Sequence, residues 1–241
     1  AANDDYNFTR VLMANARNMD AISLHYYTFP RGSFGAFGPA LNFEDAEWAS
    51  TIRNARRIDE IIAGHIAAMD EFDPQKRVAL YVDEWGTWYD ASPGEGFAYQ
   101  QNTVRDAVVA ALHLNIFMRH AGRVRLTAIA QLANVLQSMI LTRGADSVLT
   151  PTYYVYRLYV PFQDATFIPS TVTSPSYVEG DIEVPAVDVA AARGADGAIY
   201  VALLNVDPRR PANVSVRLSG VTGAAAEAQV ITGPRTDSHN D

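Results

Sequence analysis

The chain has 241 residues, 49% hydrophobic and 19% charged, so it can bury a large core and lacks the composition of a disordered protein. Its formal net charge of −8 and its scattered arginines exclude the basic stripe that nucleic-acid binding requires, and the absence of cysteine excludes disulfides and thiolate catalysis. No apolar run approaches the roughly 20 residues that span a bilayer and no export signal opens the chain, so we expect a soluble protein without a membrane partner and favour the cytoplasm over secretion.

The first 163 residues alternate between short apolar strands and amphipathic helices. In chain order we expect a helix over 4–18, a strand over 20–27, a rim loop over 28–41, a helix over 44–69, a strand over 78–83, a helix over 102–120, a strand over 124–131 and a helix over 153–162. The run 78–83 has no polar alternation, which predicts a parallel strand buried on both faces. Successive strand–helix units indicate a parallel sheet with right-handed crossovers, less than half of an eight-stranded (β/α) TIM barrel.

The remaining residues, 164–241, have a different texture. They form short runs rich in Val, Thr, Ser and Pro that are bounded by glycines. This pattern predicts an antiparallel β-sandwich. We expect its strands over 167–173, 186–192, 198–206, 214–218 and 226–231. A domain boundary is therefore expected near residue 163.

Polar side chains stand where the predicted barrel strands end, and this edge is where a (β/α) barrel keeps its active site. The three ends carry His25 with Tyr27, Asp83 with Glu84, and Gln131 or, further on, Gln137. Indole and phenol rings follow Glu84 at once, at Trp85, Trp88 and Tyr89. Sugars stack their C–H faces on such rings and take directed hydrogen bonds through their hydroxyls, so the pattern indicates a carbohydrate site.

At these residues the sequence resembles glycoside hydrolase family 51, the retaining α-L-arabinofuranosidases. The matching segments, in the family's order, are 22–27 (Ile-Ser-Leu-His-Tyr-Tyr), 83–89 (Asp-Glu-Trp-Gly-Thr-Trp-Tyr), 134–141 (Asn-Val-Leu-Gln-Ser-Met-Ile-Leu) and 149–153 (Leu-Thr-Pro-Thr-Tyr). The resemblance covers about residues 1–235. It implies that 1–163 are about strands six to eight of a TIM barrel with their helices, and that 164–241 are an incomplete sandwich of jelly-roll type.

The resemblance also implies roles for five side chains. Glu84 is expected to be the catalytic nucleophile, at the end of the seventh barrel strand. His25 and Tyr27 are expected to line the sugar subsite, with the Tyr27 hydroxyl near the nucleophile, and Trp88 to form the aromatic wall beside the arabinofuranosyl ring. Gln137 is expected to make a polar contact after the eighth strand.

Neighbouring residues compete for some of these roles. Gln131 and Asn134 are alternatives to Gln137 on the same face. Trp85 is expected to pack at the barrel rim, and Asp83 to support the site or cap a loop rather than to react. The helical histidines have no ligand-like spacing, so we expect no metal and no cofactor.

The implied mechanism is a double displacement, which needs a second carboxyl group roughly 5–5.5 Å from the nucleophile. In the family this acid/base glutamate follows an asparagine at the fourth strand, upstream of anything that corresponds to Ala1. We therefore expect the chain alone to be inactive and the complete enzyme to act on arabinoxylan, arabinan or their oligosaccharides, as a trimer or hexamer. The alternatives are a related retaining hydrolase of xylan or β-glucan and a non-catalytic, carbohydrate-binding fragment.

Overall fold

The computed structural model describes residues 1, 3–221 and 225–240. Its first part contains α1 (Tyr6–Asn15), β1 (Ala21–Thr28), α2 (Asp45–Asp70), β2 (Ala79–Thr87), α3 (Val104–Arg119), β3 (Val124–Ile129), β4 (Ile140–Arg143), β5 (Asp146–Leu149) and α4 (Pro151–Tyr159). A 3₁₀ turn, η1 (Val160–Phe162), leads into β6 (Thr166–Ile168), β7 (Ser176–Glu179), β8 (Ile182–Pro185), β9 (Val187–Arg193) and β10 (Ile199–Asn205). None of the described helices is both long and apolar enough to cross a membrane.

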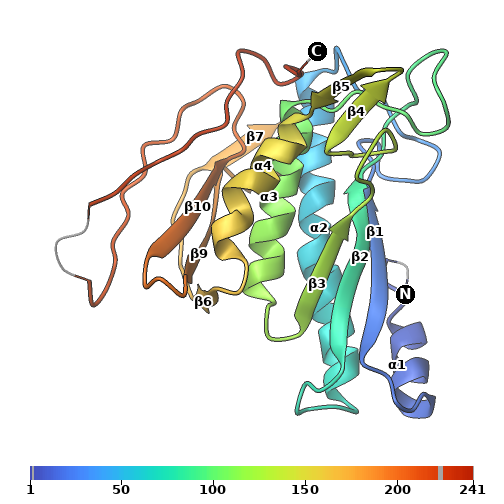
Figure 1. Ribbon diagram of the computed structural model, residues 1–241, viewed down its shortest axis with the longest axis vertical. Coiled ribbons are helices and arrows are strands. Elements are labelled where there is room, and N and C mark those ends of the chain that lie inside the picture. Colours follow the sequence, from blue (N-terminus) through green and yellow to red (C-terminus); the bar gives the residue numbers. More distant parts are fainter. Residues whose placement is uncertain (2, 222–224, 241) are drawn as a thin grey trace.

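The predicted strand–helix units of the first part are confirmed. Strands β1, β2 and β3 lie side by side in that order, and both neighbouring pairs are parallel. Their connections run through α2 and α3, which pack on one face of the sheet (Figure 1). The described sheet has three strands and does not close on itself.

The prediction that β2 is buried on both faces is only half right in the described chain. Leu80, Val82 and Trp85 point into the core against the helices and are fully buried. The opposite face carries Asp83, which is exposed, and Glu84, which is half-buried. This face of the sheet is open because no described element packs over it (Figure 1).

Helices α2 and α3 form the centre of the molecule. Helix α2 buries Ile52, Ile58 and Ile62 along one side, and α3 starts with a capping box in which Thr103 and Asp106 satisfy each other's backbone donors. One apolar cluster runs from β1 and β2 through both helices to Tyr177, Val184 and Leu204.

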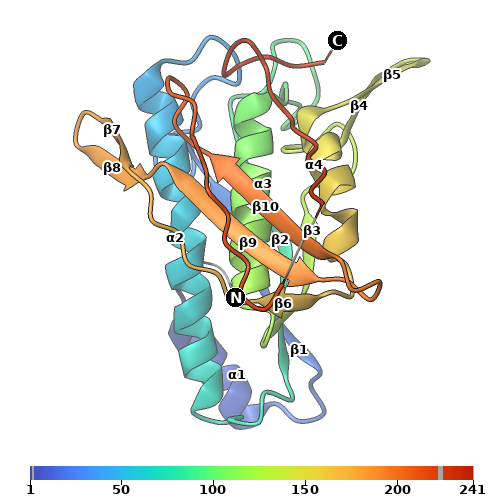
Figure 2. The ribbon, with the colours of Figure 1, turned by 90° about the vertical axis from the view of Figure 1, so that its left-hand side faces the viewer.

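A second, antiparallel sheet of order β10-β9-β6 lies on the other side of the helices. Figure 2 looks onto this sheet, with α2, α3 and α4 behind it. The indole N–H of Trp48 on α2 donates to the carbonyl of Val206, and Asp188 on β9 pairs with Arg119 on α3 at 3.0 Å. The molecule is thus layered as sheet, helices, sheet.

Two of the expected strands in the second part are absent. Residues 214–218 and 226–231 are in the described chain but belong to no strand. Residues 211–219, together with β9 and β10, line a cavity of about 600 Å³. The apolar alternation is present in these segments, but a strand also needs a hydrogen-bonded neighbour, and neither segment has one among the described residues.

Two hairpins were not predicted. Strands β4 and β5 pair around Gly144-Ala145, and β7 and β8 pair around Gly180-Asp181. Both glycines have positive φ, +61° and +59°, as tight two-residue turns require.

Candidate active site

Strands β1 and β2 bring His25, Tyr27 and Glu84 together. The parallel register places His25 opposite Glu84, and residues two apart on one strand share a face, so Tyr27 follows His25 on the same side. Nδ1 of His25 lies 2.6 Å from Oε2 of Glu84, and the Tyr27 hydroxyl donates to Oε1 of Glu84 at 2.5 Å. Both carboxylate oxygens are therefore engaged by the neighbouring strand.

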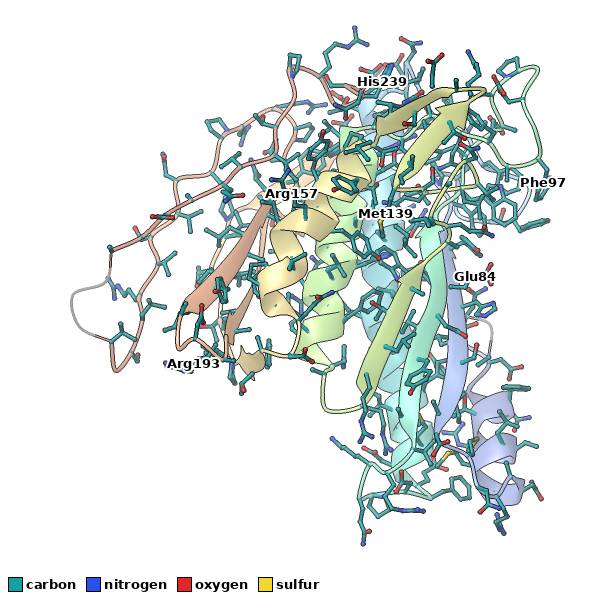
Figure 3. All side chains as sticks on the ribbon, viewed as in Figure 1. Glu84, Phe97, Met139, Arg157, Arg193 and His239 are labelled. Atoms are coloured by element: carbon teal, nitrogen blue, oxygen red, sulfur yellow. The ribbon has the colours of Figure 1, made fainter. Side chains whose placement is uncertain are left out.

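The His25 imidazole lies between two carboxylates. Its Nε2 is 3.5 Å from Oδ1 of Asp83, which also accepts a 2.7 Å hydrogen bond from the Ser23 hydroxyl. The Asp83 carboxylate thus lies beside the ring that contacts Glu84. The side chain of Glu84 keeps 34% of its surface accessible in the described chain and lies on the open face of the sheet. Figure 3 shows Glu84 on that face.

Tyr27 is a hydrogen-bond donor by virtue of its surroundings. Burial raises the pKa of its phenol far above the ordinary value, and the hydrogen bond to Glu84 and the negative charge of that residue raise it further. The phenol therefore stays protonated and can donate to a carboxylate throughout the physiological range.

An aromatic surface adjoins the carboxylate. The rings of Tyr27 and Trp88 meet edge to face with centroids 5.2 Å apart, and Phe37 stacks on Trp88 at 5.3 Å with an interplanar angle of 3°. Trp88 is fixed to the neighbouring strand because its backbone N–H donates to the carbonyl of Thr28. Trp85, by contrast, is completely buried against His113 and Phe117, so its expected packing role is confirmed.

The structure does not place Gln137 where a sugar could touch it. This residue is completely buried, and its Oε1 accepts from the Thr87 N–H at 3.0 Å. Its Nε2 donates to the carbonyl of Asp106 at 2.8 Å and to the Thr152 hydroxyl at 3.1 Å. Gln137 therefore holds the end of β2 through buried hydrogen bonds and does not face the open side of the sheet.

Gln131, one of the two alternatives to Gln137, lies in a different environment. It is exposed, two residues beyond the end of β3, and the preceding N–H, of Ala130, donates to the carbonyl of Trp85. The other alternative, Asn134, uses its side chain to bind Thr142. The signal for Gln131 was present in the sequence, since it is the last residue of the strand expected over 124–131.

The comparison with protein families fixes the relationship of the chain. Residues 83–241 match the family model described as the alpha-L-arabinofuranosidase C-terminal domain. The chain belongs to this family. The match begins at Asp83, beside the candidate nucleophile, and together with the GH51 structures described next it confirms the resemblance to glycoside hydrolase family 51.

Relatives and solved structures agree with this assignment. An "Intracellular exo-alpha-L-arabinofuranosidase" of Bacteroides ovatus is 39% identical over the whole chain, which covers 47% of that protein. A GH51 arabinofuranosidase from Xanthomonas axonopodis pv. citri, solved as a crystal structure, has 47% identity and a TM-score of 0.97 over the whole chain and 49% of its own. The thermostable GH51 alpha-L-arabinofuranosidase from Thermotoga petrophila shares the fold, with 23% identity and a TM-score of 0.77 over 100% of the chain and 49% of its own. The chain thus spans about half the length of these relatives.

Proposed function

We propose that the protein carrying this chain is a retaining α-L-arabinofuranosidase that releases terminal arabinofuranosyl groups from arabinoxylan or arabinan oligosaccharides. The observation that carries the proposal is the geometry at Glu84. Its accessible carboxylate is contacted by the Tyr27 hydroxyl and the His25 imidazole, and the Trp88 ring packs against Tyr27. A carboxylate held in place beside an aromatic wall suits a nucleophile that attacks a sugar. The names of the relatives support the same activity.

In the proposed mechanism Glu84 attacks the anomeric carbon while a general acid protonates the departing glycosidic oxygen. The resulting arabinosyl ester of Glu84 is then hydrolysed by water, which the same group deprotonates as a base. The Tyr27 donor and the His25 ring orient the carboxylate, and Gln131 is the polar contact after β3. The mechanism also needs an acid/base carboxyl group roughly 5–5.5 Å from Glu84, and we expect the complete protein to supply it from outside residues 1–241.

The architecture proposed with this function has two domains. Residues 1–163 are about strands six to eight of a TIM barrel, and residues 164–241 are part of a jelly-roll-like β-sandwich. Three adjacent parallel strands with helices on one face support the first assignment. The antiparallel β6, β9 and β10 support the second. Assembly of the complete protein as a trimer or hexamer stays a prediction.

Labelling tests the role of Glu84. The full-length protein is incubated with a mechanism-based arabinofuranosyl inactivator, and the adduct is mapped by peptide mass spectrometry, with the sugar expected on Glu84. Glu84→Gln should lose at least about 10³-fold in kcat because the nucleophile is removed. Glu71→Gln, a surface carboxylate paired with Arg10, is the control and should keep full activity.

Two results would contradict the proposal. A label on another residue of an active protein would remove Glu84 from its role. A preference for aryl xylosides or glucosides over aryl arabinofuranosides would assign the protein to a related retaining hydrolase instead.

A further inference from the structure

Two large aromatic side chains stand unusually exposed next to the candidate site. Phe34 keeps 74% of its surface accessible and Phe97 keeps 82%. Phe34 comes from the loop between β1 and α2, and Phe97 from the loop between β2 and α3. Both loops leave the strand ends that carry the site, and Figure 3 shows Phe97 on the same side of the molecule as Glu84.

Both rings reach the site through Trp88. The Phe34 ring meets Trp88 at 5.4 Å and 88°, and the Phe97 ring meets it at 6.1 Å and 86°. Trp88 in turn contacts Tyr27, whose hydroxyl binds Glu84. The aromatic surface therefore continues outward from the carboxylate, first to Trp88 and then to the two phenylalanines.

The placement of the rings separates them from the reacting sugar. A sugar attacked by Glu84 must lie against that carboxylate, within reach of Tyr27 and Trp88. The ring contacts of Phe34 are with Phe29, Phe37 and Trp88, and that of Phe97 is with Trp88. Their remaining surface is open to a group one step further from Glu84.

Exposed aromatic patches are typical of ligand-binding surfaces, because covering them with a ligand removes apolar area from water and so stabilises the complex. Aromatic faces without charged partners suit the C–H faces of a sugar ring. We propose that Phe34 and Phe97 form a second sugar-binding surface, which holds the sugar next to the cleaved bond on the leaving-group side of an oligosaccharide. This inference rests on the proposed function and adds a specificity for substrates longer than one sugar.

The experiment compares two substrates in the full-length protein. Methyl α-L-arabinofuranoside has no second sugar, whereas arabinotriose has. For Phe34→Ala and Phe97→Ala we expect kcat/KM on arabinotriose to fall about three- to tenfold through a higher KM, since one stacked ring contributes on that scale. The values for the methyl glycoside should stay unchanged, and Phe97→Trp should restore the use of arabinotriose. Phe72→Ala, an exposed phenylalanine after α2, is the matched control.

Equal losses on both substrates would overturn the second sugar-binding surface and reduce the two rings to packing for Trp88. Unchanged kinetics on both would also overturn it, and would point to another segment of the protein as the group that covers the patch. If the unaltered protein hydrolyses neither substrate, the proposed function fails separately. In that case the Kd of arabinotriose is measured by calorimetry for the unaltered and the Phe34→Ala proteins. Equal Kd values would exclude the second sugar-binding surface, and a larger Kd for Phe34→Ala would support it.

Discussion

Tyr27 and Tyr26 are adjacent tyrosines whose hydroxyls serve opposite faces of β1. The hydroxyl of Tyr27 donates to Glu84 on the open face, whereas that of Tyr26 donates to the carbonyl of Asn54 in the core. Removing the Tyr27 hydroxyl leaves one carboxylate oxygen without its donor, and hydrogen bonds to charged groups contribute about 1.5–3 kcal/mol. Tyr27→Phe should therefore lower kcat/KM of the full-length protein about 10- to 100-fold, measured on an aryl arabinofuranoside.

Tyr26→Phe is the control for that measurement. It should lower the free energy of unfolding by about 1 kcal/mol and leave kcat/KM unchanged, because its partner is a core carbonyl. Similar kinetics for Tyr27→Phe and the unaltered protein would contradict the positioning role of the Tyr27–Glu84 contact.

Residues on the strands were easier to place from the sequence than residues in the loops. His25, Tyr27 and Glu84 could be expected at one edge because parallel neighbours and a period of two bring them together. Gln137 could not be placed in this way. Between β3 and β4 the backbone adopts positive φ at Asn134 (+62°) and Leu136 (+56°). The chain turns back there towards the end of β2, and the Gln137 side chain is buried against Thr87.

At the scale of elements, long periodic segments were predictable and short ones were not. The four helices and the three parallel strands follow from apolar spacing. The hairpins β4–β5 and β7–β8 have strands of four residues, too short for a periodic signal, and only the Gly-Ala and Gly-Asp turns could have revealed them. Residues 214–218 and 226–231 show the reverse case, in which a strand-like pattern lacks a partner.

The loop after β3 secures the end of β2, and Gln137 is the residue that does so. Its amide satisfies the buried Thr87 N–H and the carbonyl of Asp106. Gln137→Leu removes this amide. The Thr87 N–H and the Asp106 carbonyl then stay buried without a hydrogen bond, which costs about 1–3 kcal/mol for each group. We expect a loss of about 3 kcal/mol in the free energy of unfolding, measured by urea denaturation.

Gln131→Leu is the matched control in the same loop. Gln131 is exposed, so its substitution should change the free energy of unfolding by less than about 0.5 kcal/mol. Because we propose that Gln131 contacts the sugar, the same substitution should lower kcat/KM on an aryl arabinofuranoside. Equal stability of the two variants would show that the network around Gln137 does not secure β2.

At the scale of the whole molecule, the helical layer joins the two sheets, and His113 lies at its centre. His113 on α3 binds the carbonyl of Ala55 on α2 at 3.1 Å and packs edge-on against Trp85 of β2. The imidazole is completely buried among Tyr26, Trp85 and Phe117, none of which is charged near neutral pH. A charge on this ring would lie in the common core of the molecule.

Burial lowers the pKa of His113 to about 4 from an ordinary value of 6.5. Between these two pH values the His113 ring binds a proton in the unfolded chain but not in the folded protein. The free energy of unfolding therefore falls as the pH drops from 6.5 towards 4. The loss from this residue is on the order of 3 kcal/mol. His113→Gln, which keeps an N–H donor for Ala55 but does not titrate, should show a correspondingly flatter dependence of unfolding free energy on pH. If the variant does not fold, the NMR titration of the His113 ring in the unaltered protein replaces it, and a pKa near 6.5 would contradict the prediction.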